Sequence, residues 1–224
     1  MVPSEWDNER CGKDGGYLVG GNHPRAVPDA GRLDRELPTT PPTRLRLAWQ
    51  VVPSGAARRE VAWDLLRAMM APGAELSNPC ARCGGPHGPV RTTDASARPA
   101  VAYANGVAVA AVASRRPGTF AIDVEVQTDP VRDAAGLNGI LGARSGVRLR
   151  DWVRVEAALK ADGRGLRVDP GTVTVAPVGS HGWRALVPNG PVIAGWDIDG
   201  PPGLVISAAF GEAAGAARVD PATP

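Results

Sequence analysis

Two acidic residues inside an apolar stretch are the part of this sequence best suited to chemistry. Segment 120–126 carries its large apolar residues at alternate positions: Phe120, Ile122, Val124 and Val126. Because strand side chains alternate between two faces, the pattern predicts a buried strand with Asp123 and Glu125 together on the other face, roughly 6–7 Å apart. Such carboxylates repel each other, and a hard divalent cation such as Mg²⁺ would relieve the repulsion. The alternative is an edge strand with a solvated polar face.

A second candidate pair, Glu156 and Lys160, lies in a segment with helical spacing. Segment 150–165 has one apolar stripe: Trp152, Val155 and Leu159. Asp151 is placed to cap the first turn, and Gly163 is placed to end the helix. Glu156 and Lys160, four residues apart, would then lie side by side next to the stripe. In isolation they are equally typical of an ordinary helix ion pair, worth about 0.3–0.5 kcal/mol.

Taken together, the acid strand and this helix resemble the signature of the Sfp-type phosphopantetheinyl transferases. The matching residues are Asp123, Glu125, Trp152, Glu156, Ala157 and Lys160. Further similarities are a Cys-x-x-Cys-Gly-Gly-Pro-His-Gly segment at 80–88, an early helix at 59–70 and a closing strand at 203–209. The resemblance covers about residues 44–210.

The resemblance implies transfer of the 4′-phosphopantetheine arm of coenzyme A to a serine of an acyl or peptidyl carrier protein, as in secondary metabolite biosynthesis. Asp123, Glu125 and Glu156 would hold Mg²⁺ against the pyrophosphate. Glu156 would also take the serine proton, and Lys160 would offset phosphate charge. Coenzyme A itself would be bound by Arg59, Arg67, Arg91 and Tyr103.

The sequence also departs from the family pattern, mainly where coenzyme A would be bound. Ala100, Ala102 and Tyr103 stand where a Ser-x-Ser-His element is usual, and Pro89 replaces a basic residue. An impaired homologue that acts as a carrier-protein-binding module is therefore the alternative function.

The resemblance implies an α+β fold of two pseudo-symmetric lobes. We expect a poorly ordered extension at 1–43, an N-terminal lobe at 44–118, a C-terminal lobe at 119–214 and a flexible tail at 215–224. Strands are expected near 44–52, 100–113, 119–126, 172–176, 183–187, 192–197 and 204–210. Helices are expected at 56–70 and 149–161, and a short helix plus loop at 129–146.

Cys80 and Cys83, with His87, allow a different interpretation. The three side chains are possible Zn²⁺ ligands, with Cys11 or His23 as a fourth. This favours a zinc-loop interaction protein as a second alternative. Otherwise these residues support a turn through Gly84, Gly85 and Gly88.

Composition and charge limit the classes of protein to which this chain could belong. A net charge of +2 without dense Lys or Arg runs argues against nucleic-acid binding. Three cysteines in 224 residues fit a reducing cytoplasm. The amino terminus lacks signal-peptide features, and the longest apolar run, 99–113, is too short to span a membrane. We therefore expect a cytoplasmic monomer.

Overall fold

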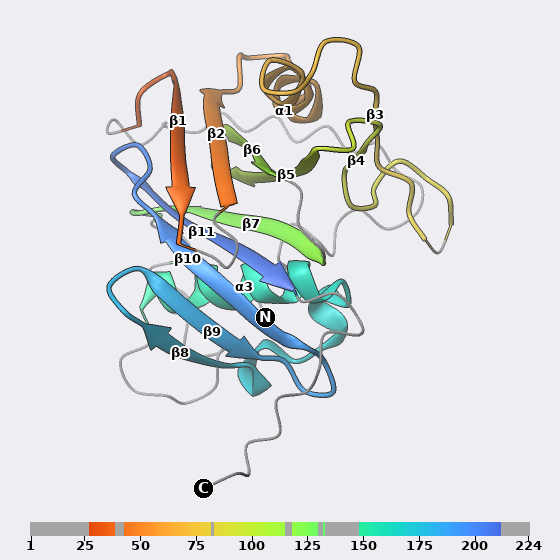
Figure 1. Cartoon of the computed structure of the whole chain (residues 1–224). Coiled ribbons are helices and arrows are strands. Elements are labelled where there is room, and N and C mark those ends of the chain that lie inside the picture. The colour runs from red at the N-terminus through yellow and green to blue at the C-terminus, as the bar shows by residue number, and fades with distance from the viewer. Residues whose placement is uncertain are drawn as a thin grey trace, which may run out of the picture.

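The computed structural model describes residues 27–38, 43–81, 83–114, 118–129, 132 and 148–211. Within them the fold is α+β, with two antiparallel sheets and one longer helix against each (Figure 1). The possible zinc ligands Cys11 and His23 lie outside the described residues. So do positions 133–146 of the expected short helix plus loop, and the expected tail at 215–224. No helix in the described ranges is long and apolar enough to cross a membrane.

The first sheet has the strand order β1-β2-β6-β5 and is covered by helix α1. Its elements are β1 (Ala30–Leu37), β2 (Thr43–Val51), α1 (Arg58–Arg67), β5 (Ala97–Ala104) and β6 (Val107–Ser114). A small two-stranded ladder, β3 (Leu76–Ser77) with β4 (Arg91–Thr92), lies between α1 and β5. Every residue of β6 except the last is buried, because one face of the strand packs on α1 and the other on the second sheet.

The second sheet has the order β7-β11-β10-β9-β8 and packs against helix α3. Its elements are β7 (Thr119–Val126), α3 (Leu149–Asp162), β8 (Thr174–Val178), β9 (Gly182–Leu186), β10 (Val192–Ile198) and β11 (Leu204–Gly211). Two short 3₁₀ turns, Gly165–Arg167 and Pro170–Thr172, connect α3 to β8. The helix α3 ends as expected at Gly163, which has a φ of 82°.

The main core lies between the two sheets. Leu45, Leu47 and Val109 from the first sheet pack with Ile122 and Ile206 from the second. Helix α3 closes a separate core on the opposite face of the second sheet. As a result β7 is buried on both faces, although it is the edge strand of its sheet.

Two expectations about the first sheet are wrong. The region 1–43 was expected to be poorly ordered, but residues 30–37 form β1, which pairs antiparallel with β2. The buried Leu37 and the ion pair between Asp34 and Arg44 join β1 to β2. The many charged residues of β1 give it no clear apolar pattern in the sequence. The single strand expected at 100–113 is a hairpin, because Asn105 and Gly106, with φ of 37° and 80°, form a tight turn between β5 and β6.

Candidate active site

Strand β7 carries both candidate acids on its helix-facing side. Ile122, Val124 and Val126 point into the core between the sheets, whereas Ala121 packs with α3. Asp123 and Glu125 share the face of Ala121 because strand side chains alternate. Asp123 is only 5% exposed, so the alternative of a solvated polar face is wrong.

Helix α3 carries the second candidate pair onto the same interface. Its apolar stripe of Trp152, Val155 and Leu159 is buried against the second sheet, as the sequence predicts. Asp151 accepts a hydrogen bond from the Arg148 backbone N–H and so fixes the first turn. Glu156 is 6% exposed, which is unusual for a glutamate and places its carboxylate inside the strand–helix interface.

The two elements are joined by an ion pair between Lys160 and Asp123. Lys160 Nζ donates to Asp123 Oδ1 at 2.6 Å, and both side chains are largely buried. Lys160 is therefore more than the partner of Glu156 in a surface helix pair. The other oxygen, Asp123 Oδ2, is buried and accepts no hydrogen bond from the described residues.

The acids of this cluster hold their protons more tightly than usual. Burial, followed by repulsion from Asp123, raises the pKa of Glu125 to about 7, although Arg132 and Trp152 favour its carboxylate. Burial and repulsion from Asp123 and Glu125 likewise raise the pKa of Glu156 to about 7, against the attraction of Lys160. Burial also raises the pKa of Asp123, despite its ion pair. The strand–helix interface thus confines three mutually repelling carboxylates.

Lys160 responds in the opposite direction to the same charges. Burial alone would lower the pKa of Lys160, but Asp123, Glu156 and Glu125 together raise it above the usual value. Its ammonium group is therefore retained at neutral pH and above. With Lys160 and Arg132 as its cations, the cluster of three carboxylates would still carry net negative charge when all three are ionised.

Arg132 is a member of this site that sequence reasoning missed. Its guanidinium lies 3.2 Å from Glu125 Oε2 and donates to the Val126 carbonyl at 2.8 Å. The Arg132 backbone N–H also donates to Asp129 Oδ1. An acidic residue three positions before an arginine, directly after the acid strand, is the sequence signal that could have identified it.

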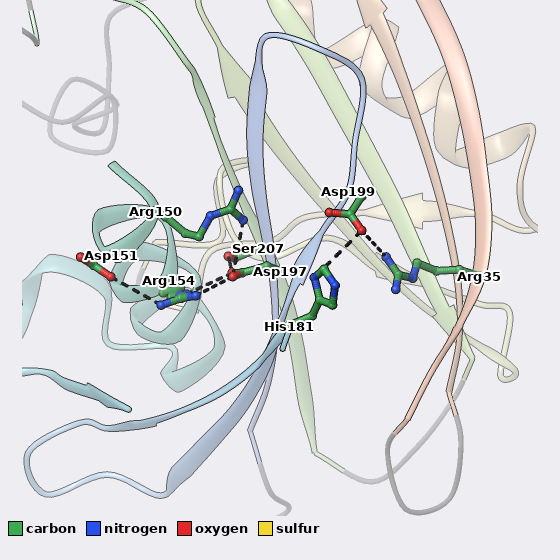
Figure 2. Close-up of polar contacts among 8 residues, drawn as sticks. All are labelled: Arg35, Arg150, Asp151, Arg154, His181, Asp197, Asp199 and Ser207. Atoms are coloured by element: carbon green, nitrogen blue, oxygen red, sulfur yellow. Dashed lines mark hydrogen bonds and ion pairs between the residues drawn. The ribbon is translucent and has the colours of Figure 1, made fainter. Parts of the chain in front are cut away.

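Sequence reasoning also missed a further buried acid, Asp197 on β10, whose contacts are drawn in Figure 2. Unlike Asp123, it accepts hydrogen bonds at both carboxylate oxygens. Arg154 of α3 donates to Asp197 at 3.1 and 2.6 Å, and Ser207 of β11 donates at 2.8 Å. Burial would raise the pKa of Asp197, but these bonds hold it below the usual value. This network fastens α3 to the sheet and thereby positions Glu156 and Lys160.

The residues expected to bind coenzyme A lie in the first sheet and its connections. Arg59 on α1 donates to the Pro86 carbonyl at 2.6 Å, and Arg67 pairs with Asp64 on the same helix. Tyr103 on β5 lies under the guanidinium of Arg58, 4.8 Å from the ring centroid. Arg91 is an exposed residue of β4. Among the described residues, Arg59, Arg67 and Arg91 make no hydrogen bond or ion pair with the acid cluster.

The donor chemistry of the cluster fits a hard divalent cation. Three carboxylates supply only oxygen ligands, and Asp123 Oδ2 is a buried oxygen that needs a partner. A bound cation would also offset the repulsion among these buried carboxylates. The three carboxylates are not close enough to one another to count as a ready-made metal site. Within the described residues, the side chains that form such a group are Cys80, Cys83 and His87, whose possible ligand atoms all lie within 4.8 Å of one another. Joint binding of one ion by the acids would need side-chain rotation.

Comparison with known proteins adds no family assignment to this geometry. The sequence matches no protein-family model, and no curated protein shows significant similarity to it.

Proposed function

We propose that this protein is a magnesium-dependent transferase that moves the 4′-phosphopantetheine arm of coenzyme A to a serine of an acyl or peptidyl carrier protein. The observation that carries the proposal is the burial of Asp123 and Glu156 at the interface of β7 and α3, together with the ion pair that the largely buried Lys160 makes with Asp123. These three residues are among the six on which the resemblance to the Sfp-type enzymes rests. Burial of Asp123 with one unsatisfied oxygen, beside Glu156 with its raised pKa, lowers the stability of the fold. Groups of this kind are concentrated at functional sites.

The order of strands and helices supports two related lobes. In the first sheet, β2 is followed by α1 and then by the hairpin β5–β6, whose last strand pairs with β2. In the second sheet, β7 is followed by α3 and later by the hairpin β10–β11, whose last strand pairs with β7. In both, the helix lies on one face of the sheet. This repeated connectivity is what two pseudo-symmetric lobes require.

The acid cluster supplies the residues for the metal-dependent part of the reaction. Asp123, Glu125 and Glu156 would hold Mg²⁺, which would neutralise charge on the pyrophosphate of coenzyme A. Arg132 forms an ion pair with Glu125 at 3.2 Å and so helps to fix its carboxylate. Lys160, retained as a cation by its neighbours, stabilises negative charge that grows on the phosphate during transfer.

Glu156 is the residue suited to accept the serine proton. A base is most effective when its pKa lies near the working pH, and burial raises the pKa of Glu156 to about 7. The serine oxygen forms a bond to the β-phosphorus as the bond to the adenosine 3′,5′-bisphosphate breaks. The proton passes from the serine to Glu156, directly or through water.

Binding of coenzyme A would rely on residues around α1. Arg58, which stacks on Tyr103, and Arg59, which lies at the loop around Pro86, give this region positive charge near an aromatic ring. Arg67 and Arg91 are exposed, and Arg67 also pairs with Asp64. These groups take the place of the Ser-x-Ser-His element that the sequence lacks.

The proposal is tested by incubating the full chain with Mg²⁺, coenzyme A and several carrier proteins, and measuring intact masses. The wild type should add roughly 340 Da to a carrier protein, the mass of one phosphopantetheine group. Glu156→Gln should slow transfer by about 10²–10⁴-fold, the usual contribution of a general base. The control is Glu60→Gln, which alters an exposed glutamate of α1 and should leave the rate unchanged.

Absence of any mass gain with the whole set of carrier proteins would refute the transferase. A carrier protein that still binds the Asp123→Asn and Glu125→Gln variants, yet is never modified, would instead identify a carrier-protein-binding module.

A further inference from the structure

A separate group of chemically active side chains lies in the connection between β3 and β4, the two strands of a small sheet of their own (Figure 1). Possible ligand atoms of Cys80, Cys83 and His87 all lie within 4.8 Å of one another. Cys83 Sγ is 3.3 Å from His87 Nε2, and neither cysteine is in a disulfide. The proposed transferase chemistry uses none of the three.

The distances between these atoms suit a tetrahedral metal ion. With bonds of about 2.3 Å to sulfur and about 2.0 Å to nitrogen, ligand atoms around Zn²⁺ lie roughly 3.6–3.8 Å apart. The observed separations of 3.3 Å and up to 4.8 Å bracket that spacing, so small side-chain rotations are enough to bring the ligands into place. Two thiolates with one imidazole favour Zn²⁺ over the hard cation that the carboxylates of the other site prefer.

The backbone of the loop is folded to present these ligands. The Cys80 N–H donates to the Gly85 carbonyl at 2.8 Å, and the Gly84 N–H donates back to the Cys80 carbonyl at 2.9 Å. Gly84 has a φ of 72°, a conformation that disfavours side chains. A Cβ on Gly88 would lie 2.2 Å from the Pro79 carbonyl oxygen, so the loop closes only with glycine there.

We propose that Cys80, Cys83 and His87 bind one Zn²⁺ ion, with solvent in the fourth coordination position. Cys83 is exposed, so that position is open to water. The Pro86 carbonyl, one residue before His87, accepts hydrogen bonds from Arg59 of α1 at 2.6 Å and from Asn78 at 2.7 Å. An ion held by His87 would therefore stabilise a loop that is already joined to α1, and its ligands are separate from the acid cluster.

The test is elemental analysis of the full chain, purified from zinc-supplemented cells and passed through gel filtration. About one zinc per chain is expected for the wild type. The Cys80→Ser/Cys83→Ser double variant should lose it. Cys11→Ser, which removes the remaining cysteine, and Asp123→Asn, which alters the acid cluster, should both retain it.

Cobalt gives an independent readout of the ligands. Metal-free wild type titrated with Co²⁺ should develop a thiolate-to-metal charge-transfer band and the visible bands of tetrahedral Co²⁺, and His87→Ala should weaken both. Gly88→Ala should lower affinity for zinc while leaving all three ligands present.

Zinc content of the wild type no higher than that of the double variant, with no cobalt charge-transfer band, would overturn the proposal. A Cys80–Cys83 disulfide, detected as a loss of two hydrogens in the intact mass and resistance to alkylation, would overturn it as well. Full zinc retention by the double variant would place the metal elsewhere and have the same consequence.

Discussion

Lys160 on α3 donates a 2.6 Å hydrogen bond to Asp123 on β7, 37 residues earlier in the chain. The bond crosses the strand–helix interface and places the only lysine of the described acid cluster against its most buried acid. Because the pair is enclosed, removing one partner leaves the other charged and without compensation.

Lys160→Met should therefore lower the free energy of unfolding by about 3–5 kcal/mol, the usual cost of breaking a buried ion pair from one side. Urea denaturation followed by tryptophan fluorescence measures the change. The double variant Asp123→Asn/Lys160→Met should recover part of the loss, because it removes both charges. Arg67→Ala is the matched control: its exposed pair with Asp64 should contribute about 0–1 kcal/mol. Equal losses of unfolding free energy in Lys160→Met and Arg67→Ala would contradict the prediction.

The two arginines that face Asp197 should differ in their importance. Arg154 is largely buried and donates twice to the carboxylate, whereas the more exposed Arg150 lies 3.4 Å away. Arg154→Met should cost about 3 kcal/mol or more, since it removes the main partner of a buried acid. Arg150→Met should cost about 1 kcal/mol or less. Figure 2 shows both arginines beside Asp197. A larger loss for Arg150→Met than for Arg154→Met in urea denaturation would contradict the assignment of Arg154 as the main partner of Asp197.

The raised pKa values predict an unusual dependence of stability on pH. Between about pH 4.5 and 7 the folded chain keeps protons on Glu125 and Glu156 that the unfolded chain releases. The folded state thus binds more protons, and stability in the presence of a chelator should fall as pH rises through this window. Glu125→Gln/Glu156→Gln should flatten the slope, whereas the exposed Glu75→Gln should not. A slope that is unchanged in the double variant would contradict these pKa values.

Divalent cations should counter that loss of stability. Mg²⁺ competes with protons for Glu125 and Glu156, so it should raise the melting temperature more at pH 8 than at pH 5. Differential scanning fluorimetry with and without Mg²⁺ measures the difference. Asp123→Asn should reduce the effect because it weakens the most buried ligand. An equal rise in melting temperature at both pH values, or an undiminished rise in the Asp123→Asn variant, would argue against Mg²⁺ binding at the acid cluster.

Much of the second sheet could be predicted from the sequence because its patterns are local. The alternation in 120–126 and the stripe of Trp152, Val155 and Leu159 each depend on neighbours a few residues apart, and both elements are observed at about the expected bounds. The four short strands after α3 also follow their expected positions. The first sheet was predicted less well, because half of the residues of β1 are charged. Its two leucines, the half-buried Leu33 and the buried Leu37, gain their surroundings only when β1 pairs with β2.

The sequence by itself determined that Asp123 and Glu125 share one face of a strand and that Glu156 and Lys160 share one turn of a helix. Only the tertiary structure decided that these faces meet, that Lys160 bonds to Asp123 and that Arg132 bonds to Glu125. It also decided that Cys80, Cys83 and His87 converge. The physical reason is that spacing along the chain fixes the direction of a side chain within its own element. Burial, pKa and ion pairing depend instead on which other elements pack against it.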